Sequence, residues 1–169
     1  MKRAVFVVIL LAFPGVASAE PFQFGILGGG AQSMEDGFEF DFGEGVTEVF
    51  AGARVDVATM FNVKLGQADA PVGPTGIAAD DAKVEYIAGQ VEYQFDEIWG
   101  SSSVFAGPGV YRSRAADLEE TSFGLSGGVN ASFPLTRRFA LLLELSYHWA
   151  NFEEDYTFVT ATGGLKVSF

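Results

Sequence analysis

Apolar and polar residues alternate with a period of two along most of this chain, as they do in a β-strand whose two faces meet different surroundings. The clearest run covers residues 139–149, where Phe, Leu, Leu, Leu, Tyr and Trp are separated by Ala, Leu, Glu, Ser and His. The same pattern predicts eight strands in all, at 22–31, 46–57, 60–66, 83–95, 103–113, 122–133, 139–149 and 156–169.

The run at 103–113 is the least regular of the eight. Phe105 and Tyr111 share one face with glycines, whereas Val104 and Val110 share the other. Pro108 has no amide hydrogen for a sheet, so we expect a bulge at that position.

The connections between the predicted strands alternate in length. Short ones, at 58–59, 96–102 and 134–138, are separated by longer polar ones at 32–45, 67–82, 114–121 and 150–155. Small outer-membrane barrels have short periplasmic turns and longer extracellular loops, and an even number of strands. The spacing therefore predicts an up-and-down antiparallel barrel with all long loops at one end.

The first residues have the three parts of a secretory signal peptide. Lys2 and Arg3 precede an apolar run at 4–12, and Ala17-Ser18-Ala19 supplies small residues for cleavage. We expect removal of residues 1–19, leaving 20–169 as one barrel domain. The alternative, an uncleaved membrane anchor, is disfavoured because a spanning helix needs about 20 apolar residues.

Composition narrows the possible functions. The formal net charge of −12 argues against nucleic acid as a partner, because binding it requires a basic surface. The absence of cysteine excludes disulfides, thiolate metal sites and thiol catalysis.

The direction in which the apolar face points separates two kinds of barrel. Aromatic residues lie near the strand ends of that face, where a membrane barrel has its interfacial girdles. We assign to these girdles Tyr93, Phe95, Phe133, Phe139, Tyr147 and Trp149. The pattern favours lipid outside, while the alternative is a soluble periplasmic barrel that binds ligands inside, like a lipocalin.

The signal peptide, the eight alternating strands, the alternating connections and the final Phe169 together resemble the small outer-membrane barrels of the OmpA/OmpX type. The resemblance implies an all-β, eight-stranded antiparallel up-and-down transmembrane β-barrel in the outer membrane of a Gram-negative bacterium. Its implied partners are outer-membrane lipid and lipopolysaccharide.

The last strand also resembles the signal that the barrel assembly machinery recognises, which implies that machinery as a further partner. Phe158 and Ala161 are grouped with its apolar face. The residues that carry the signal are Gly163, Leu165, Val167 and Phe169.

The opposite face of the strands predicts a charged lumen. The charged network expected there consists of Glu48, Arg54, Asp56, Lys64, Glu92, Arg112, Glu144, His148 and Lys166. Buried charges are tolerated when they are paired, so we expect the bases to pair with the acids and to plug the barrel. The alternative is a narrow ion-conducting pore gated by a base that changes its carboxylate partner, as the resemblance to OmpA-like barrels suggests.

The only histidine, His148, is the one candidate for catalysis. The sequence His148-Trp149-Ala150-Asn151 resembles the His-x-Ser-Asn stretch of small lipid A deacylases, but Ala150 has no hydroxyl to act as the nucleophile. We therefore expect no enzyme, cofactor or metal, and interpret His148 as a lumen residue bonded to Glu144.

The long loops contain most of the acidic residues, such as Glu35, Asp36, Asp80, Asp81 and Glu154. They could meet an extracellular partner, supply oxygens to a divalent cation, or simply repel neighbouring chains. The sequence thus predicts a non-enzymatic outer-membrane protein that acts in envelope structure or surface interaction.

Overall fold

The computed structural model describes residues 21–34, 44–69, 83–97, 100–115, 118–153 and 155–169. The predicted signal peptide and much of the predicted acidic loops lie outside these residues. The eight strands are β1 (Phe22–Ser33), β2 (Glu44–Arg54), β3 (Thr59–Asp69), β4 (Lys83–Glu97), β5 (Gly100–Ala115), β6 (Leu118–Pro134), β7 (Phe139–Ala150) and β8 (Tyr156–Ser168).

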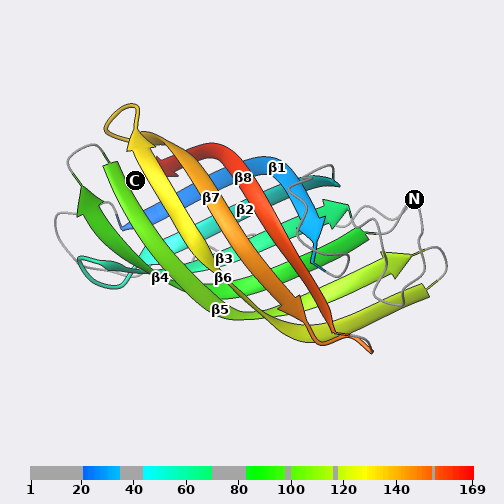
Figure 1. Cartoon of the computed structure of the whole chain (residues 1–169). Coiled ribbons are helices and arrows are strands. Elements are labelled where there is room, and N and C mark those ends of the chain that lie inside the picture. The colour runs from blue at the N-terminus through cyan, green and yellow to red at the C-terminus, as the bar shows by residue number, and fades with distance from the viewer. Residues whose placement is uncertain (1–20, 35–43, 70–82, 98–99, 116–117, 154) are drawn as a thin grey trace, which may run out of the picture.

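The strands form one closed barrel in which each pairs antiparallel with its neighbour in sequence (Figure 1). Closure occurs between β1 and β8, with Phe24 opposite Val167 and Ile26 opposite Leu165. The backbone amides and carbonyls of Phe22 and Phe169 bond to each other at 3.1 and 3.0 Å. The predicted eight-stranded antiparallel up-and-down barrel is confirmed. Within the described residues, no helix has the length and apolar character needed to cross a membrane.

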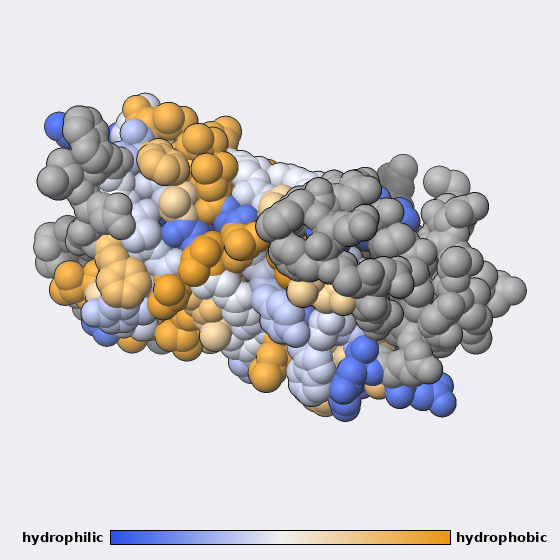
Figure 2. Space-filling view, in the orientation of Figure 1, coloured by the Kyte–Doolittle hydropathy of each residue, from blue (hydrophilic) through white to orange (hydrophobic). Residues whose placement is uncertain are grey.

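The pleat directs large apolar side chains to the outer wall and most polar strand residues inward, where they share the lumen with apolar side chains. On β7, Leu142 and Glu144 are buried, whereas Leu141 and Leu145 are exposed to 38% and 48%. Other strands repeat this arrangement, so large apolar residues gather on the outer wall (Figure 2). A water-soluble barrel would have the reverse arrangement, so the lipocalin-like alternative is wrong and the wall is that of a membrane-spanning barrel.

The second strand ends earlier than its apolar alternation predicts. Val55 and Val57 lie in a turn and are exposed to 64% and 86%. The Asp56 carboxylate accepts bonds from the amides of Ala58 at 2.9 Å and Thr59 at 2.8 Å. The hydrogen bonds from Asp56 stabilise a turn in spite of the preference of the two valines for a strand, because Asp readily accepts bonds from the amides two and three residues ahead.

The bulge expected at Pro108 does not form. Val110 and Ala106 on β5 face Ile87 and Val91 on β4, so equal numbers of residues separate the two pairs and none is extra. Gly107 and Pro108 of β5 have no paired residue on β4, whereas both are paired with β6, where Pro108 is opposite Leu125. The proline therefore interrupts one ladder without changing its register.

Inward-facing glycines make room for large side chains on the next strand. A Cβ atom on Gly66 would overlap the Tyr86 ring, and one on Gly25 would overlap the Phe50 ring. An eight-stranded barrel has an interior just wide enough for side chains to fill. These glycines let aromatic rings lie across it.

Candidate functional site

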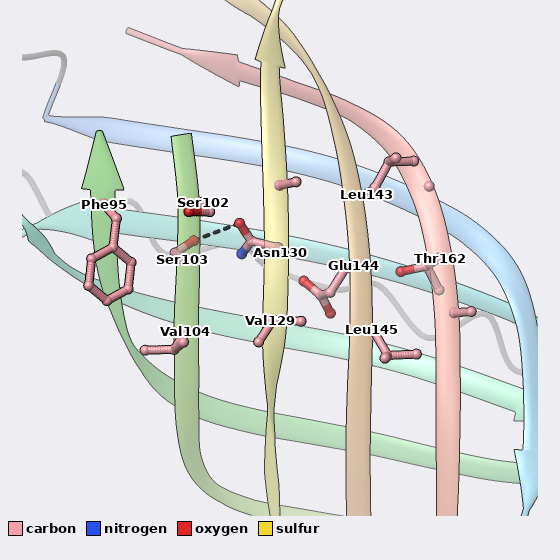
Figure 3. Close-up of a pocket in the computed structure, with 13 residues that line it drawn as sticks. Phe95, Ser102, Ser103, Val104, Val129, Asn130, Leu143, Glu144, Leu145 and Thr162 are labelled. Atoms are coloured by element: carbon pink, nitrogen blue, oxygen red, sulfur yellow. Dashed lines mark hydrogen bonds between the residues drawn. The ribbon is translucent and has the colours of Figure 1, made fainter. Parts of the chain in front are cut away.

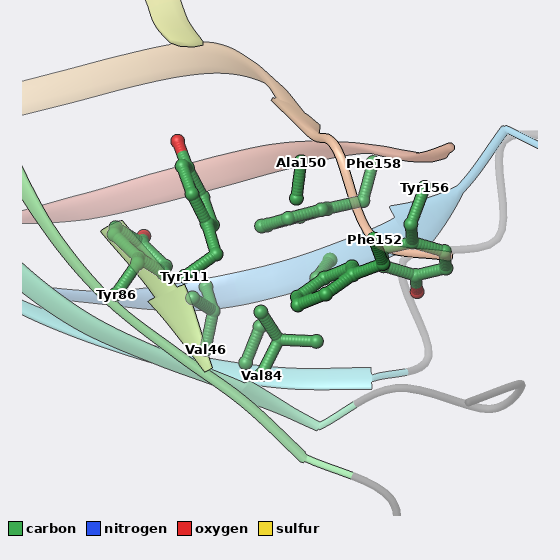
Figure 4. Packing of buried hydrophobic residues seen from close by; sticks show 10 residues of the cluster. Val46, Val84, Tyr86, Tyr111, Ala150, Phe152, Tyr156 and Phe158 are labelled. Atoms are coloured by element: carbon green, nitrogen blue, oxygen red, sulfur yellow. The ribbon is translucent and has the colours of Figure 1, made fainter. Parts of the chain in front are cut away.

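The interior is filled in two halves, an aromatic one at the loop end and a mainly polar one toward the short turns, in which Leu27, Phe50 and Leu142 form a smaller apolar cluster. At the loop end lies an aromatic cluster in which every residue is at most 5% exposed (Figure 4). The cluster consists of Ala31, Val46, Ala68, Val84, Tyr86, Tyr111, Ala150, Phe152, Tyr156 and Phe158. Phe152 belongs to the connection between β7 and β8, so this hairpin contributes a ring to the mouth of the barrel.

His148 lies at the edge of the aromatic cluster that is nearer the short-turn end, and it is fully buried. Its ring stacks on Phe158 with centroids 4.5 Å apart, and its Nδ1 lies 3.1 Å from the Tyr111 hydroxyl. Its Nε2 has no hydrogen-bond partner among the described residues. The expected bond to Glu144 is wrong, because the Tyr111 hydroxyl from β5 lies against one ring nitrogen and the other has no partner among the described residues.

Glu48 connects the aromatic cluster to the polar half. The Tyr86 hydroxyl donates to Glu48 Oε1, and the Thr162 hydroxyl donates to Glu48 Oε2 at 3.3 Å. Only 1% of Glu48 is exposed. A buried carboxylate needs such donors in place of water, so here a tyrosine stands where a basic partner was expected.

The central ion pair joins Lys64 on β3 to Glu144 on β7 across the lumen. The Ser146 hydroxyl also donates to Glu144, at 2.7 Å. The Lys64 ammonium lies 4.7 Å from the centroid of the Phe105 ring, within the range of a cation–π contact. Since both side chains are 3% exposed, each charge depends on the other.

Toward the turn end, Glu92 is held by neutral groups. It accepts a bond from Asn62 Nδ2, and Gln23 Nε2 donates to Asn62 Oδ1 at 2.9 Å. The Ser103 hydroxyl lies within hydrogen-bond distance of Glu92 Oε1 and of Asn130 Oδ1. A basic partner was expected for Glu92, whereas the partners that the structure gives it are amides and a hydroxyl.

The space left between these polar groups is small. A cavity of about 10 Å³ is lined by residues of both networks, among them Lys166, Glu92 and Glu144. One water molecule needs about 10–15 Å³ by the same measure. The described lumen therefore has room for about one water there and no wide water column.

Three predicted lumen bases and acids lie elsewhere or have other partners. Arg54 is half-buried at the turn end, where it donates to the Val57 carbonyl at 2.7 Å and to Gln94 Oε1 at 3.4 Å. Asp56 is in the exposed turn described above. Arg112 points outward because it shares its face with Val110, and it pairs with Glu119.

Hydrogen bonds hold the Asp56 carboxylate in its charged form. The amides of Ala58 and Thr59 donate to it and lower the pKa of this carboxyl below its ordinary value. The group is fully exposed, so its effect is confined to the turn.

Aromatic residues that fill the lumen were missed or placed on the wrong face. The prediction that Phe158 shares the apolar outward face with Ala161 is wrong, because Phe158 is an even number of residues from Thr160 and shares that residue's inward row. Counting the period strictly back from Thr160 would have identified it. The same count places Tyr86 in the inward row of Gln90 and Glu92 and Tyr111 on the face opposite to that of Val110, but their hydrogen-bond partners, on distant strands, had no signal in the sequence.

The residues predicted for the girdles all point outward. Tyr93, Phe95, Phe133, Phe139 and Tyr147 are 42–50% exposed, and Trp149 is half-buried. Leu165 and Phe169 of the predicted assembly signal are 55% and 52% exposed. Gly163 and Val167 share this outward row and are half-buried.

Acidic residues near the loop end pair locally where they are described. Glu119 pairs with Arg112 and, at 3.8 Å, with Arg114, while Asp69 lies 3.6 Å from Lys83. In the described part of the chain, no three His, Asp or Glu side chains come together as a metal site. Glu35, Asp36, Asp80, Asp81 and Glu154 lie outside it.

The fold is similar to solved small outer-membrane barrels. Neisserial surface protein A has a TM-score of 0.66 and 19% identity, covering 88% of this chain and 96% of that one. The N-terminal barrel of Pseudomonas aeruginosa OprF has a TM-score of 0.59 and 12% identity, covering 87% and 97%. Yersinia pestis Ail, in a complex with the heparin analogue sucrose octasulfate, has a TM-score of 0.50 and 14% identity, covering 86% and 99%.

No model of a known protein family matches the chain, and no curated protein matches its sequence. The structural similarity confirms the predicted resemblance to small barrels of the OmpA/OmpX type at the level of the fold. Together with the apolar outer wall, it identifies a transmembrane barrel of the outer-membrane kind.

Proposed function

We propose that this protein is a non-enzymatic barrel of the bacterial outer membrane that acts in envelope structure or surface interaction and whose lumen is closed to ions. The filled interior carries this proposal. The aromatic cluster occupies the loop end, and the polar half leaves a cavity of only about 10 Å³. Ion flow needs a continuous water path, which this packing does not provide.

Planar-bilayer recording tests the closed lumen. We expect no conductance steps from the purified barrel, whose folded state is verified by a mobility shift between unheated and boiled gel samples. A Tyr86→Ser, Tyr111→Ser, Phe158→Ser variant, with three lumen rings truncated, serves as a conducting control once the same shift is seen. Steps from the unaltered protein that disappear in Glu144→Gln would overturn the closed lumen.

A narrow gated pore is the second candidate, and the surroundings of Lys64 favour it. Its partner Glu144 is opposite Thr162, which also donates to Glu48. The Glu48 carboxylate is therefore separated from Glu144 by a single residue, Thr162. Transfer of Lys64 from Glu144 to Glu48 would open a path, and Glu48→Gln should then abolish any steps.

The absence of catalysis is also part of this proposal. His148 is buried against Phe158, and the neighbouring Ala150 is likewise buried and without a hydroxyl. Lipid A in an overexpressing strain should keep an unchanged mass. A loss of acyl chains that depends on His148 would contradict the proposal.

We also propose lipopolysaccharide, outer-membrane lipid and the assembly machinery as partners. The outward row of β8 ends in Leu165, Val167 and Phe169, and Phe169 lies at the seam with Phe22, ring centroids 6.4 Å apart. We expect Phe169→Ala to lower the amount of heat-modifiable barrel in the outer membrane. Leu135→Ala, at an exposed turn residue, is the control and should leave that amount unchanged. The acidic loops remain a proposed contact for an extracellular partner.

A further inference from the structure

A groove of about 720 Å³ crosses the outer wall over β4 to β8 (Figure 3). Its sides are Phe95, Val104, Val129, Leu143 and Leu145, all exposed on the outer face. Its volume lies within the range of small-molecule sites, about 300–1,000 Å³.

The groove exists because small residues stand in the outward rows between these large ones. Ala131, Ala161 and Gly163 line its floor and leave the strand backbone accessible. The Asn130 and Glu144 side chains point away from it into the lumen, where Asn130 bonds to Ser103 (Figure 3). No charged side chain of the described residues therefore enters the groove from outside.

The groove is continuous with the lipid-facing surface, and two of the strands that form it, β6 and β7, are joined by a basic turn. Arg137 and Arg138, in the connection from β6 to β7, are exposed, and neither guanidinium has a carboxylate partner among the described residues. This connection lies at the short-turn end, which faces the periplasm in such barrels.

The distance between turn and groove suits a lipid. Leu143 is five residues beyond Arg138, about 17 Å along a strand at about 3.4 Å per residue. A strand tilt of about 40° reduces this to about 13 Å along the bilayer normal. One leaflet contributes about 15 Å of hydrocarbon. A phosphate at the turn thus places the end of its acyl chain in the groove.

We propose that the groove binds one acyl chain of an anionic glycerophospholipid from the periplasm-facing leaflet, with its phosphate at Arg137 and Arg138. The proposal rests on the proposed outer-membrane location. The apolar walls select the chain, and the two arginines select the negative headgroup.

Native mass spectrometry of the folded barrel, with phosphatidylglycerol and phosphatidylethanolamine of equal chain length, tests the proposal. We expect Ala161→Phe to fill the groove and lower retention of both lipids about tenfold, as for the loss of about two methylene contacts. The control is Ala51→Phe, at an exposed outward alanine of β2 outside the groove, which should retain lipid normally.

A second pair of variants tests the headgroup. Arg137→Gln with Arg138→Gln should lower the retention of phosphatidylglycerol more than that of phosphatidylethanolamine and so remove the preference for phosphatidylglycerol, because both lipids carry a phosphate but only phosphatidylglycerol has a net negative charge. The matched pair Arg112→Gln with Arg114→Gln, at the loop end, should keep that preference. If both double variants show the same preference for phosphatidylglycerol, the assignment of an anionic headgroup to Arg137 and Arg138 is wrong.

Equal lipid retention in Ala161→Phe and Ala51→Phe would overturn the groove itself. A dimer that Ala161→Phe alone converts to a monomer, with lipid retention unchanged, would instead assign the groove to a second copy of this chain. Cell fractionation and the heat-dependent mobility shift report the membrane barrel independently, so failure of the lipid site is distinguishable from failure of the proposed location.

Discussion

The two halves of the lumen solve the same problem with different chemistry. At the loop end, stacked and tilted rings fill the space, with few polar atoms to satisfy. In the polar half, Lys64, Glu144 and Glu92 are buried with partners from strands far apart in sequence. The aromatic half gains from excluding water, whereas the polar half is only as stable as its pairing is complete. A well-packed barrel interior therefore does not require charge pairing throughout.

The largest effect should follow from breaking the central ion pair. Lys64→Met leaves Glu144 buried without its partner, and we expect a loss of about 3–5 kcal/mol in the free energy of unfolding. Lys64→Met with Glu144→Leu should recover most of the loss, because it removes both charges. Urea unfolding in detergent micelles measures the change. A single variant as stable as the unaltered barrel would contradict the polar half described here.

A smaller loss is expected where the two halves meet. Gly66→Ala places a methyl group against the Tyr86 ring and pushes its hydroxyl from Glu48, which we expect to cost about 1–3 kcal/mol. The control is Gly28→Ala, where the nearest atom to an added Cβ is the Val46 carbonyl oxygen at 3.8 Å. If both variants unfold at the same urea concentration, the close approach of Tyr86 is wrong.

Removing one hydroxyl from the aromatic half should cost less again. Tyr111→Phe keeps the ring packing but removes the contact with His148, and we expect about 1 kcal/mol. Tyr147→Phe changes an exposed residue of the outer wall and should stay within about 0.5 kcal/mol. Urea midpoints that rank these two variants in the opposite order would reverse the assignment of inner and outer faces.

The smallest effect should come from the turn at Asp56, outside both halves. Because its folded pKa is lowered, the carboxylate contributes stability above its unfolded pKa of about 3.9. That contribution is lost as the pH falls below about 4 and through the folded pKa. The difference in urea midpoint between Asp56→Asn and the unaltered barrel should therefore become smaller as the pH is lowered through this range.

The turn at 135–138 provides a control for the Asp56 prediction, because the side chain that stabilises it is a hydroxyl that does not titrate. The Thr136 hydroxyl accepts bonds from the amides of Arg138 at 3.2 Å and Phe139 at 3.0 Å, in the position that Asp56 has in its own turn. Thr136→Ala should lower the urea midpoint by the same amount at every pH. A pH-dependent difference there would mean that other groups cause the effect ascribed to Asp56.

The sequence alone determined the number of strands and their order through the period-two alternation, and the aromatic residues near the strand ends indicated that the apolar face points outward. This works because every residue of a closed sheet faces either the lumen or the outside, so one local rule repeats along each strand. The rule failed at Val55 and Val57, where the Asp56 side chain stabilises a turn. The outward-pointing Arg112 shows in addition that a charged residue does not always face the lumen.

Only the tertiary structure decided which interior groups pair. Lys64 and Glu144 are 80 residues apart, and Tyr86 and Glu48 are 38 apart. Their meeting depends on how the strands cross the lumen, which no local spacing records. The groove on the outer wall has the same origin, since Ala131 and Ala161 become neighbours of Leu143 and Leu145 through the register of β6, β7 and β8. Alternation assigns each residue to a face, while closure of the barrel assigns its partners.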